Sequence, residues 1–333
     1  MLVCIANILH PSCRPSKHRP LVMLSRCFPR TFPRFFSSYA VNDGSHLGDA
    51  LSKSIETVPL AFDKHESPTE SIKSPLIFLH GLFGSKSNNR TVAKLLAESM
   101  ARDVYCLDLR NFGLSPHAKR LDYPSLAADV ERFIEEESMP QKPILIGHSM
   151  GAKTAMALAL RRPDLPKMIV SVDNAPGCLS ASGGPFGKYI RQLRYALEVK
   201  QYTNIKDVDA ELAKVEPSKE VRQFLLTNVN RGKKHEPCTS KIPLQVIGDA
   251  VTSGNIASWP YDPTVSRWTR GPALFVRGTE SKYVPDDVLP DIGNYFPDFE
   301  VRDIKAGHWV ISEKPQEFME VLREFVERKE DDE

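Results

Sequence analysis

Short apolar runs alternate with amphipathic segments along most of the chain. Runs of three to six mostly apolar residues, typical of buried strands, occupy 75–80, 104–109, 143–146, 168–172, 273–276 and 299–301. Apolar residues at helical spacing predict helices over 88–100, 124–137, 153–160 and 315–327. Strands and helices that alternate in this way build a mostly parallel sheet with helices on both faces, so the pattern predicts an α/β fold.

This rhythm stops between residues 178 and 245, where the pattern is mostly helical and rich in charge. In open α/β sheets, ligands bind at the carboxyl ends of the strands. We therefore expect residues 178–245 to form a helical cap insertion over that edge of the sheet. The core is predicted to consist of residues 57–177 and 246–330, and residues 39–56 are predicted to be a polar linker in front of it.

The first 42 residues hold six Lys or Arg and no Asp or Glu, together with several Ser and Phe. This composition is typical of a mitochondrial transit peptide, and the run at 33–38 resembles a site for a matrix protease. Five prolines interrupt every stretch that could serve as a secretory signal. We expect a transit peptide at residues 1–38 and a mitochondrial location, in the matrix. The alternative is a disordered basic tail without a targeting role.

The charge balance changes once this leader is set apart. The 44 Lys and Arg and 42 Asp and Glu of the chain give a net charge of +2. Because six of the basic residues and none of the acidic ones precede Asp43, the rest of the chain carries a net charge of −4. The folded part therefore has no basic footprint for nucleic acid. No stretch approaches 18 uninterrupted apolar residues, so we expect no transmembrane segment.

The cysteines show no pattern typical of a zinc site or a disulfide framework. Three of the six lie in the predicted transit peptide, and Cys106, Cys178 and Cys238 are widely spaced. Such spacing suits a reducing compartment. The sequence also has no dinucleotide-binding glycine motif and no metal-ligating constellation, so we expect no cofactor and no metal.

The strongest chemical signal is Gly147-His148-Ser149-Met150-Gly151, which lies between a predicted strand and a predicted helix. In that setting the serine occupies a strained strand-to-helix turn that exposes its hydroxyl group at the sheet edge. Bulky side chains two residues away on either side would clash, which explains the two glycines. Ser149 is the predicted nucleophile; the alternative is a purely structural turn.

A serine hydroxyl needs a neighbouring base, and in this architecture the base follows the nucleophile in the chain. Only His235 and His308 follow Ser149. His235 lies in a Lys-rich loop of the insertion, whereas His308 lies between a predicted strand and the last predicted helix. Gly307 and Trp309 flank His308 and indicate a tight, packed turn. His308 is the predicted base; the alternative is an exposed loop histidine.

The acid that orients the base has two candidates. The common position follows the strand at 273–276, where Glu280 is available and no Asp occurs before Asp286. The other position is the end of the strand at 168–172, which Asp173 follows directly. We choose Asp173 as the acid and keep Glu280 as the alternative acid. Asp173 could also serve only to end the strand with a turn.

An oxyanion hole needs two backbone N–H groups that point at the negative oxygen formed during the reaction. Met150, directly after the nucleophile, would supply one of them. Leu82 would supply the other, because it lies in the glycine-rich loop at 80–85 after the first core strand. The alternative is an ordinary glycine-rich loop. The loop at 108–115 also looks functional, but we interpret it as structural.

Together these motifs resemble a mitochondrial subgroup of the α/β-hydrolases that contains abhydrolase-domain esterases and the fungal ethanol acetyltransferases. The likeness spans about residues 57–328 and is carried by His80-Gly81-Leu82-Phe83-Gly84-Ser85, 108–117, Gly147-His148-Ser149-Met150-Gly151-Ala152-Lys153, Val172-Asp173 and Gly307-His308-Trp309. The stretch Asp173-Asn174-Ala175-Pro176 is similar to the fungal branch.

The resemblance implies an α/β-hydrolase fold with a helical cap. In that subgroup the acid lies 24 residues after the nucleophile, which corresponds to Asp173 in this chain. The common glycine after the motif is replaced by Ala152, which is nearly as small and should have little effect. The activities implied are ester and thioester hydrolysis and, in the fungal branch, acetyl transfer from acetyl-CoA to ethanol.

Three functions remain open at this point. The first is acyl transfer through an acyl-enzyme on short-chain esters or thioesters, with acetyl-CoA as a possible substrate, ethanol as acceptor, and esterase and thioesterase side activity. The second is a carboxylesterase or thioesterase without useful transfer. The third is a partner-binding mitochondrial protein with a relic hydrolase site, which the intact set of Ser149, Asp173 and His308 argues against.

Overall fold

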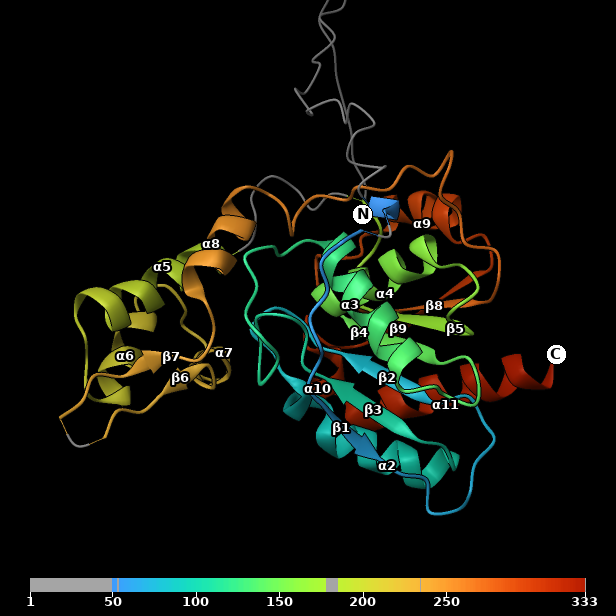
Figure 1. Ribbon diagram of the computed structural model, residues 1–333, viewed down its shortest axis with the longest axis horizontal. Helices are drawn as coiled ribbons and strands as arrows, with labels where there is room; N and C mark the ends of the chain where they lie inside the picture. The colour runs from blue at the N-terminus through green and yellow to red at the C-terminus, as the bar shows by residue number, and fades with distance from the viewer. Residues whose placement is uncertain (1–49, 53, 178–184, 234, 333) are drawn as a thin grey trace, which may run out of the picture. The chain divides into compact units, whose positions relative to one another are not determined.

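The computed structural model describes residues 50–52, 54–177, 185–233 and 235–332 (Figure 1). The predicted transit peptide lies outside these residues. The described residues belong to one compact unit built around a seven-stranded sheet in the order β1-β3-β2-β4-β5-β8-β9. The strands are β1 Phe62–His65, β2 Leu76–Leu79, β3 Val104–Leu107, β4 Ile144–His148, β5 Met168–Val172, β8 Ala273–Gly278 and β9 Phe299–Ile304.

Neighbouring strands pair in parallel except at one edge, where β1 pairs with β3 in antiparallel fashion. All six predicted strands are present, which confirms the mostly parallel sheet. The pattern missed β1, because Asp63 and Lys64 interrupt any apolar run and each residue of this edge strand is at least partly exposed. At the opposite edge, β9 also carries charges, at Glu300, Arg302 and Asp303.

Helices cover both faces of the sheet, as predicted. Ile77 of β2 belongs to one core cluster with α3 and α4, whereas the next residue, Phe78, belongs to a second cluster with α2 and α11. This alternation follows from the two-residue repeat of a strand, which sends successive side chains to opposite faces. The covering helices are α2 Arg90–Met100, α3 Tyr123–Glu136, α4 Met150–Arg161, α9 Leu289–Tyr295 and α11 Pro315–Asp331.

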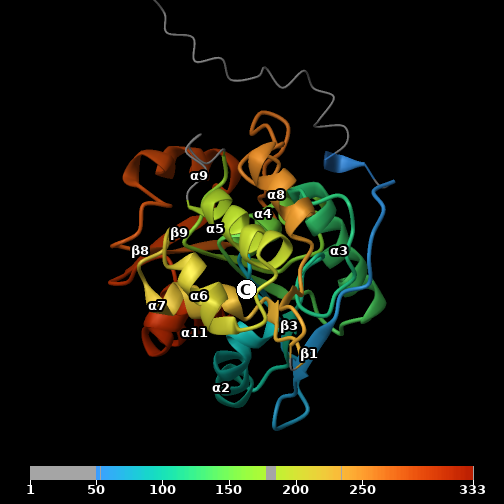
Figure 2. The same cartoon turned by 90° about the vertical axis from the view of Figure 1, so that its left-hand side faces the viewer.

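The segment between β5 and β8 is largely helical, and Figures 1 and 2 show α5, α6 and α7 grouped together. Its elements are α5 Phe186–Arg194, the π-helical turn η2 Tyr195–Val199, α6 Ile205–Leu212, α7 Lys219–Leu226, the short paired strands β6 Val229–Asn230 and β7 Thr239–Ser240, and α8 Leu244–Thr252. The two-stranded β6-β7 sheet was not predicted. The predicted end of the cap at residue 245 falls inside α8, so the helical segment extends further than expected.

Part of the predicted linker packs on the folded unit. Ala50 and Ile55 are buried, and the Arg161 guanidinium of α4 donates hydrogen bonds to the carbonyl oxygens of Ala50 and Ser52, at 3.1 and 2.6 Å. The described part of 39–56 is therefore tied to the core by backbone contacts that its polar composition does not reveal. Among the helices described, none combines the length and the apolar character needed to cross a bilayer.

The loop at 108–115 has the structural role that we expected. The Asp108 carboxylate accepts hydrogen bonds from the backbone N–H groups of Lys86 and Leu114, at 2.7 and 2.8 Å. The Arg110 guanidinium forms a two-pronged ion pair with Asp129 of α3, with N–O distances of 2.5 and 2.7 Å. Both side chains of this ion pair are almost completely buried, so it fixes the loop after β3 against α3.

Replacing Asp129 with Ala should lower the free energy of unfolding by about 3–5 kcal/mol, because Arg110 would remain buried without its counter-charge. Urea denaturation followed by circular dichroism measures this loss. Glu136→Ala is the matched control on the same helix. The ion pair of Glu136 with Arg132 is exposed, so this change should cost less than about 1 kcal/mol. Equal losses of unfolding free energy in the two variants would contradict the stabilising role of the Arg110–Asp129 ion pair.

Candidate active site

Ser149 lies in the tight turn between β4 and α4, with a positive φ of 55° and a ψ of −113°, angles that L-residues rarely adopt. Its N–H group donates to the carbonyl oxygen of Val172, at 3.0 Å. A Cβ atom on Gly147 would lie 2.1 Å from the carbonyl oxygen of Gly151, and one on Gly151 would lie 2.0 Å from that of Leu79. Only glycine fits at both positions, which is the steric reason for the motif.

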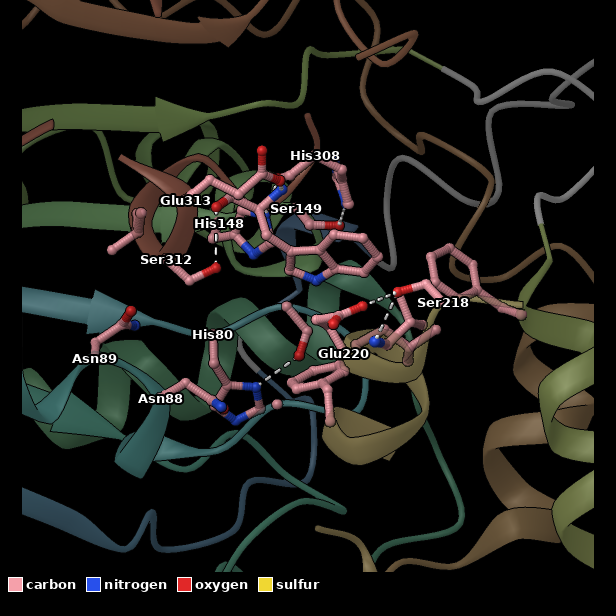
Figure 3. A pocket seen from close by; sticks show the side chains of 18 residues that line it. His80, Asn88, Asn89, His148, Ser149, Ser218, Glu220, His308, Ser312 and Glu313 are labelled. Atoms are coloured by element: carbon pink, nitrogen blue, oxygen red, sulfur yellow. Dashed lines mark hydrogen bonds between the residues drawn. The ribbon is translucent and has the colours of Figure 1, made fainter. Parts of the chain in front are cut away.

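The structure brings Ser149, Asp173 and His308 into one hydrogen-bonded chain, of which Figure 3 shows the Ser149 and His308 side chains. The Ser149 hydroxyl lies 3.0 Å from Nε2 of His308, and Nδ1 of His308 lies 2.7 Å from Oδ2 of Asp173. A carboxylate accepts from an N–H group, so the imidazole proton belongs on Nδ1. Nε2 is then free to accept the serine proton.

Asp173 lies at the end of β5 and is completely buried. The N–H group of Gly278 donates to its Oδ1 at 3.1 Å, and the hydroxyl group of Ser281 donates to its Oδ2 at 2.5 Å. Its own N–H group donates to the carbonyl oxygen of Val276, at 2.8 Å. The end of β8 and the segment that follows it therefore hold the carboxylate in place with hydrogen-bond donors.

Glu280, the alternative acid, is exposed and has no hydrogen bond to His308 within the part of the chain that the structure describes. Its N–H group donates to the carbonyl oxygen of Ala306, which fixes the loop but leaves the carboxylate outside the site. The Tyr283 ring, a few residues further on, stacks on the imidazole of His308. His235, the other candidate base, is exposed on the segment between β6 and β7.

The loop that carries His308 is fixed from three sides. The Tyr283 ring is stacked on the imidazole with 3.9 Å between ring centres and an angle of 18° between the planes. The ring of His148 donates from Nε2 to the carbonyl oxygen of His308, at 2.7 Å. The Glu313 carboxylate of α10 (Val310–Glu313) accepts from the N–H groups on either side of His308, at 2.7 and 3.3 Å.

Three residues of the site, Ser281, Tyr283 and Glu313, were not predicted from the sequence. Ser281 and Tyr283 lie in the stretch that was searched for an acid, but nothing in their types or spacing distinguishes them from ordinary loop residues. Glu313 follows His308 by five residues, and only the fold of the loop shows that its carboxylate turns back to the preceding N–H groups.

Two further histidines beside Ser149 are uncharged. Burial lowers the pKa of His80. Because Nε2 of His80 accepts a hydrogen bond from the N–H group of Leu109, at 3.0 Å, this nitrogen carries no proton. Burial, and next the nearby His308 imidazole, lower the pKa of His148 from 6.5 to about 3. The surroundings of the serine therefore gain no positive charge from these rings near neutral pH.

The predicted oxyanion donors lie beside Ser149. The loop that contains Leu82 passes close to the serine, because a Cβ atom on Gly81 would lie 3.2 Å from Cβ of Ser149. Nδ1 of His80 donates to the carbonyl oxygen of Gly81 at 2.8 Å and so holds this loop. Met150 begins α4 directly after the serine. The N–H groups of Leu82 and Met150 thus belong to two backbone segments that lie next to Ser149.

A pocket of about 600 Å³, here called the large pocket, opens onto Ser149 and His308 (Figure 3). Its walls include Val221 and Phe224 of α7 and Trp309 beside the base. Its described lining contains two carboxylates and no Lys or Arg. A second pocket of about 40 Å³, the small pocket, is also lined by Ser149. The remaining residues of the small pocket are Leu82, Tyr123, Met150, Asn174, Phe186, Val251, Ile256, Ala257 and Tyr283.

This architecture defines the class of the protein. A mostly parallel sheet, a serine in a glycine-flanked turn after a central strand, and an aspartate and a histidine from later strand ends are typical of the α/β-hydrolases. The chain belongs to the α/β-hydrolase fold family, whose model matches residues 74–315. The family and its relatives identify the chain as a hydrolase or acetyltransferase enzyme.

Individual relatives refine this picture. A probable alcohol acetyltransferase of Saccharomyces cerevisiae is 45% identical over 271 residues, which cover 78% of this chain and 79% of the yeast protein. The sn-1-specific diacylglycerol lipase ABHD11 of Danio rerio is 33% identical over 91% of this chain and 93% of its own length. The solved structure of a marine microorganism esterase matches with a TM-score of 0.71 and 33% identity, over 81% of this chain and all of the esterase. These relatives confirm the subgroup that the motifs suggested.

The lowered pKa of His148 predicts a pH-dependent stability. The unfolded chain takes up a proton at this histidine near pH 6.5, whereas the folded protein does so only near pH 3. Acidification between these values therefore favours the unfolded state, and the free energy of unfolding should fall by up to about 1.4 kcal/mol per pH unit from this residue.

His148→Gln should remove that contribution, so the difference in stability between wild type and variant should change steadily between pH 6.5 and 4. Above pH 7.5 the difference should be constant, which serves as the internal control. Urea denaturation across this pH range measures both. A difference that does not vary with pH would show that His148 titrates normally in the folded protein.

Proposed function

We propose that this chain transfers acyl groups from esters or thioesters through a covalent acyl-enzyme on Ser149. The observation that carries the proposal is the hydrogen-bonded chain from the Ser149 hydroxyl through His308 to Asp173. A serine hydroxyl becomes a competent nucleophile when a base takes its proton and a buried carboxylate stabilises the resulting imidazolium ion.

The proposed reaction has two halves. In the first, the Ser149 oxygen bonds to the carbonyl carbon while Nε2 of His308 takes the hydroxyl proton. The N–H groups of Leu82 and Met150 stabilise the negative oxygen of the tetrahedral intermediate. The bond between the carbonyl carbon and the oxygen or sulfur of the leaving group then breaks, and His308 returns the proton to that oxygen or sulfur. In the second half, water or an alcohol attacks the carbonyl carbon of the acyl-enzyme while Nε2 of His308 takes its proton. The bond between that carbon and the Ser149 oxygen then breaks, His308 returns the proton to Ser149, and the acid or a new ester is released.

The finer proposal is acetyl transfer from acetyl-CoA to ethanol, with esterase and thioesterase side activity. The name of the Saccharomyces cerevisiae relative supports an alcohol as acceptor. The large pocket sets a condition on the donor. Its described lining contains Glu220 and Glu313 and no cationic side chain, so the phosphates of CoA would have to stay outside it.

Hydrolysis without useful transfer is the second candidate. The large pocket, at about 600 Å³, offers far more space than ethanol needs, and the Danio rerio relative is described as a diacylglycerol lipase.

For location, we propose the mitochondrial matrix. The acid-free, Arg-containing composition of residues 1–38 supports this proposal.

Turnover of acetyl-CoA with and without ethanol tests the proposal. We expect ethyl acetate when ethanol is present, and a loss of at least about 1000-fold in Ser149→Ala, because the nucleophile is gone. Free CoA, acetate and ethyl acetate are measured separately. Acetate alone, unchanged by ethanol, would favour the hydrolase. No turnover of any ester or thioester, and no labelling of Ser149 by a fluorophosphonate probe, would favour the relic site.

The acid can be tested with a pair of matched variants. Asp173→Asn should lower kcat by about 10⁴-fold, because an amide can no longer hold the imidazole proton on Nδ1. Glu280→Gln makes the same chemical change on the exposed alternative acid and should change kcat by less than about twofold. The measurement is hydrolysis of p-nitrophenyl acetate. A large loss in Glu280→Gln with a small loss in Asp173→Asn would reverse the assignment.

A further inference from the structure

The two pockets that meet at Ser149 differ in the catalytic groups that line them. His308 lines the large pocket, together with Trp309 of the same loop. The small pocket is lined by Met150, whose N–H group is a proposed oxyanion donor, and His308 is not among its lining residues. Leu82 borders both. A carbonyl carbon bound to Ser149 would therefore have two different spaces for its two substituents.

Proton transfer decides which substituent enters which space. The leaving oxygen or sulfur takes its proton from Nε2 of His308, so the alcohol or thiol part must lie on the side of that nitrogen. We propose that the large pocket binds the alcohol or thiol part and the small pocket binds the acyl chain, so that the enzyme is selective for short acyl groups. This inference rests on the proposed acyl-enzyme function and names the substrate class of that site.

The size of the small pocket sets the limit on the acyl chain. Its volume is about 40 Å³, and on the same scale a single water needs about 10–15 Å³. The pocket therefore holds an acetyl group and little more than one or two further carbon atoms. The large pocket, at about 600 Å³, sets no comparable limit on the alcohol.

The walls of the small pocket are braced against expansion. Tyr123, at the start of α3, is almost fully buried, and its hydroxyl group donates to the carbonyl oxygen of Ile256 at 2.7 Å. This bond joins the core helix to the segment after α8. On another side the Tyr283 ring is held by its stacking on His308. These contacts oppose a widening of the small pocket on the sides of Tyr123 and Tyr283.

The test compares one variant in each pocket, made in the full-length chain. Ile256→Ala removes atoms from the wall of the small pocket, and Val221→Ala does the same in the large pocket. The kcat/KM value is measured for p-nitrophenyl acetate and p-nitrophenyl hexanoate, which differ only in the acyl chain, and for ethyl acetate and hexyl acetate, which differ only in the alcohol.

We expect wild type to prefer p-nitrophenyl acetate over the hexanoate by about 100-fold or more, and Ile256→Ala to reduce this ratio by about tenfold. Val221→Ala should leave the acyl ratio within about twofold of wild type and change the ratio of hexyl to ethyl acetate instead. Val251→Ala, a second change in the small pocket, gives the same test if Ile256→Ala does not fold.

Several results would overturn the inference. They are a wild type that accepts hexanoyl and acetyl groups equally, a small-pocket variant that folds and leaves the acyl ratio unchanged, or a Val221→Ala variant that shifts the acyl ratio by tenfold. Failure of the proposed function looks different, because wild type would then show no Ser149-dependent turnover of any of the four esters.

Discussion

The hydrogen bond between Asp173 and His308 is the interaction on which the rest of the site depends. It places a carboxylate with no solvent exposure against an imidazole that also faces a large pocket. Burial of a lone carboxylate would be costly, and here three donors surround it: an imidazole N–H, a backbone N–H and the Ser281 hydroxyl. The Asp173 carboxylate is therefore shielded from water and held in position, and it can fix the orientation of the His308 base.

The order of the strands explains how these groups meet. Strands β4, β5, β8 and β9 are consecutive neighbours in the sheet, although a helical segment separates β5 from β8 in the chain. The ends of these strands supply, in that order, Ser149, Asp173, the Ser281 hydroxyl and His308. The Ser281 hydroxyl donates to Asp173 from an adjacent strand end, whereas the loop after β9 brings His308 back to both Asp173 and Ser149.

The sequence reveals those parts of this arrangement that depend on local rules. The six predicted strands follow from apolar runs, and the turn at Ser149 is indicated by two glycines, since a Cβ atom at either position would collide with the backbone. The sequence favoured Asp173 as the acid but left Glu280 open, because the choice depends on which carboxylate reaches the imidazole. Tyr283 and Glu313 were not predicted for the same reason, since their contacts with the His308 loop exist only after folding.

The outermost strands have a consequence for the behaviour of the protein in a crowded solution. An open sheet edge can recruit a strand from another molecule, and this is a common route to aggregation. On β1, Asp63 is paired with Lys86 and Arg90, and on β9, Glu300 is paired with Arg328. A strand added at either edge would have to disturb or desolvate these ion pairs. Paired charges thus lie on both outermost strands of the sheet, and they disfavour edge-to-edge association.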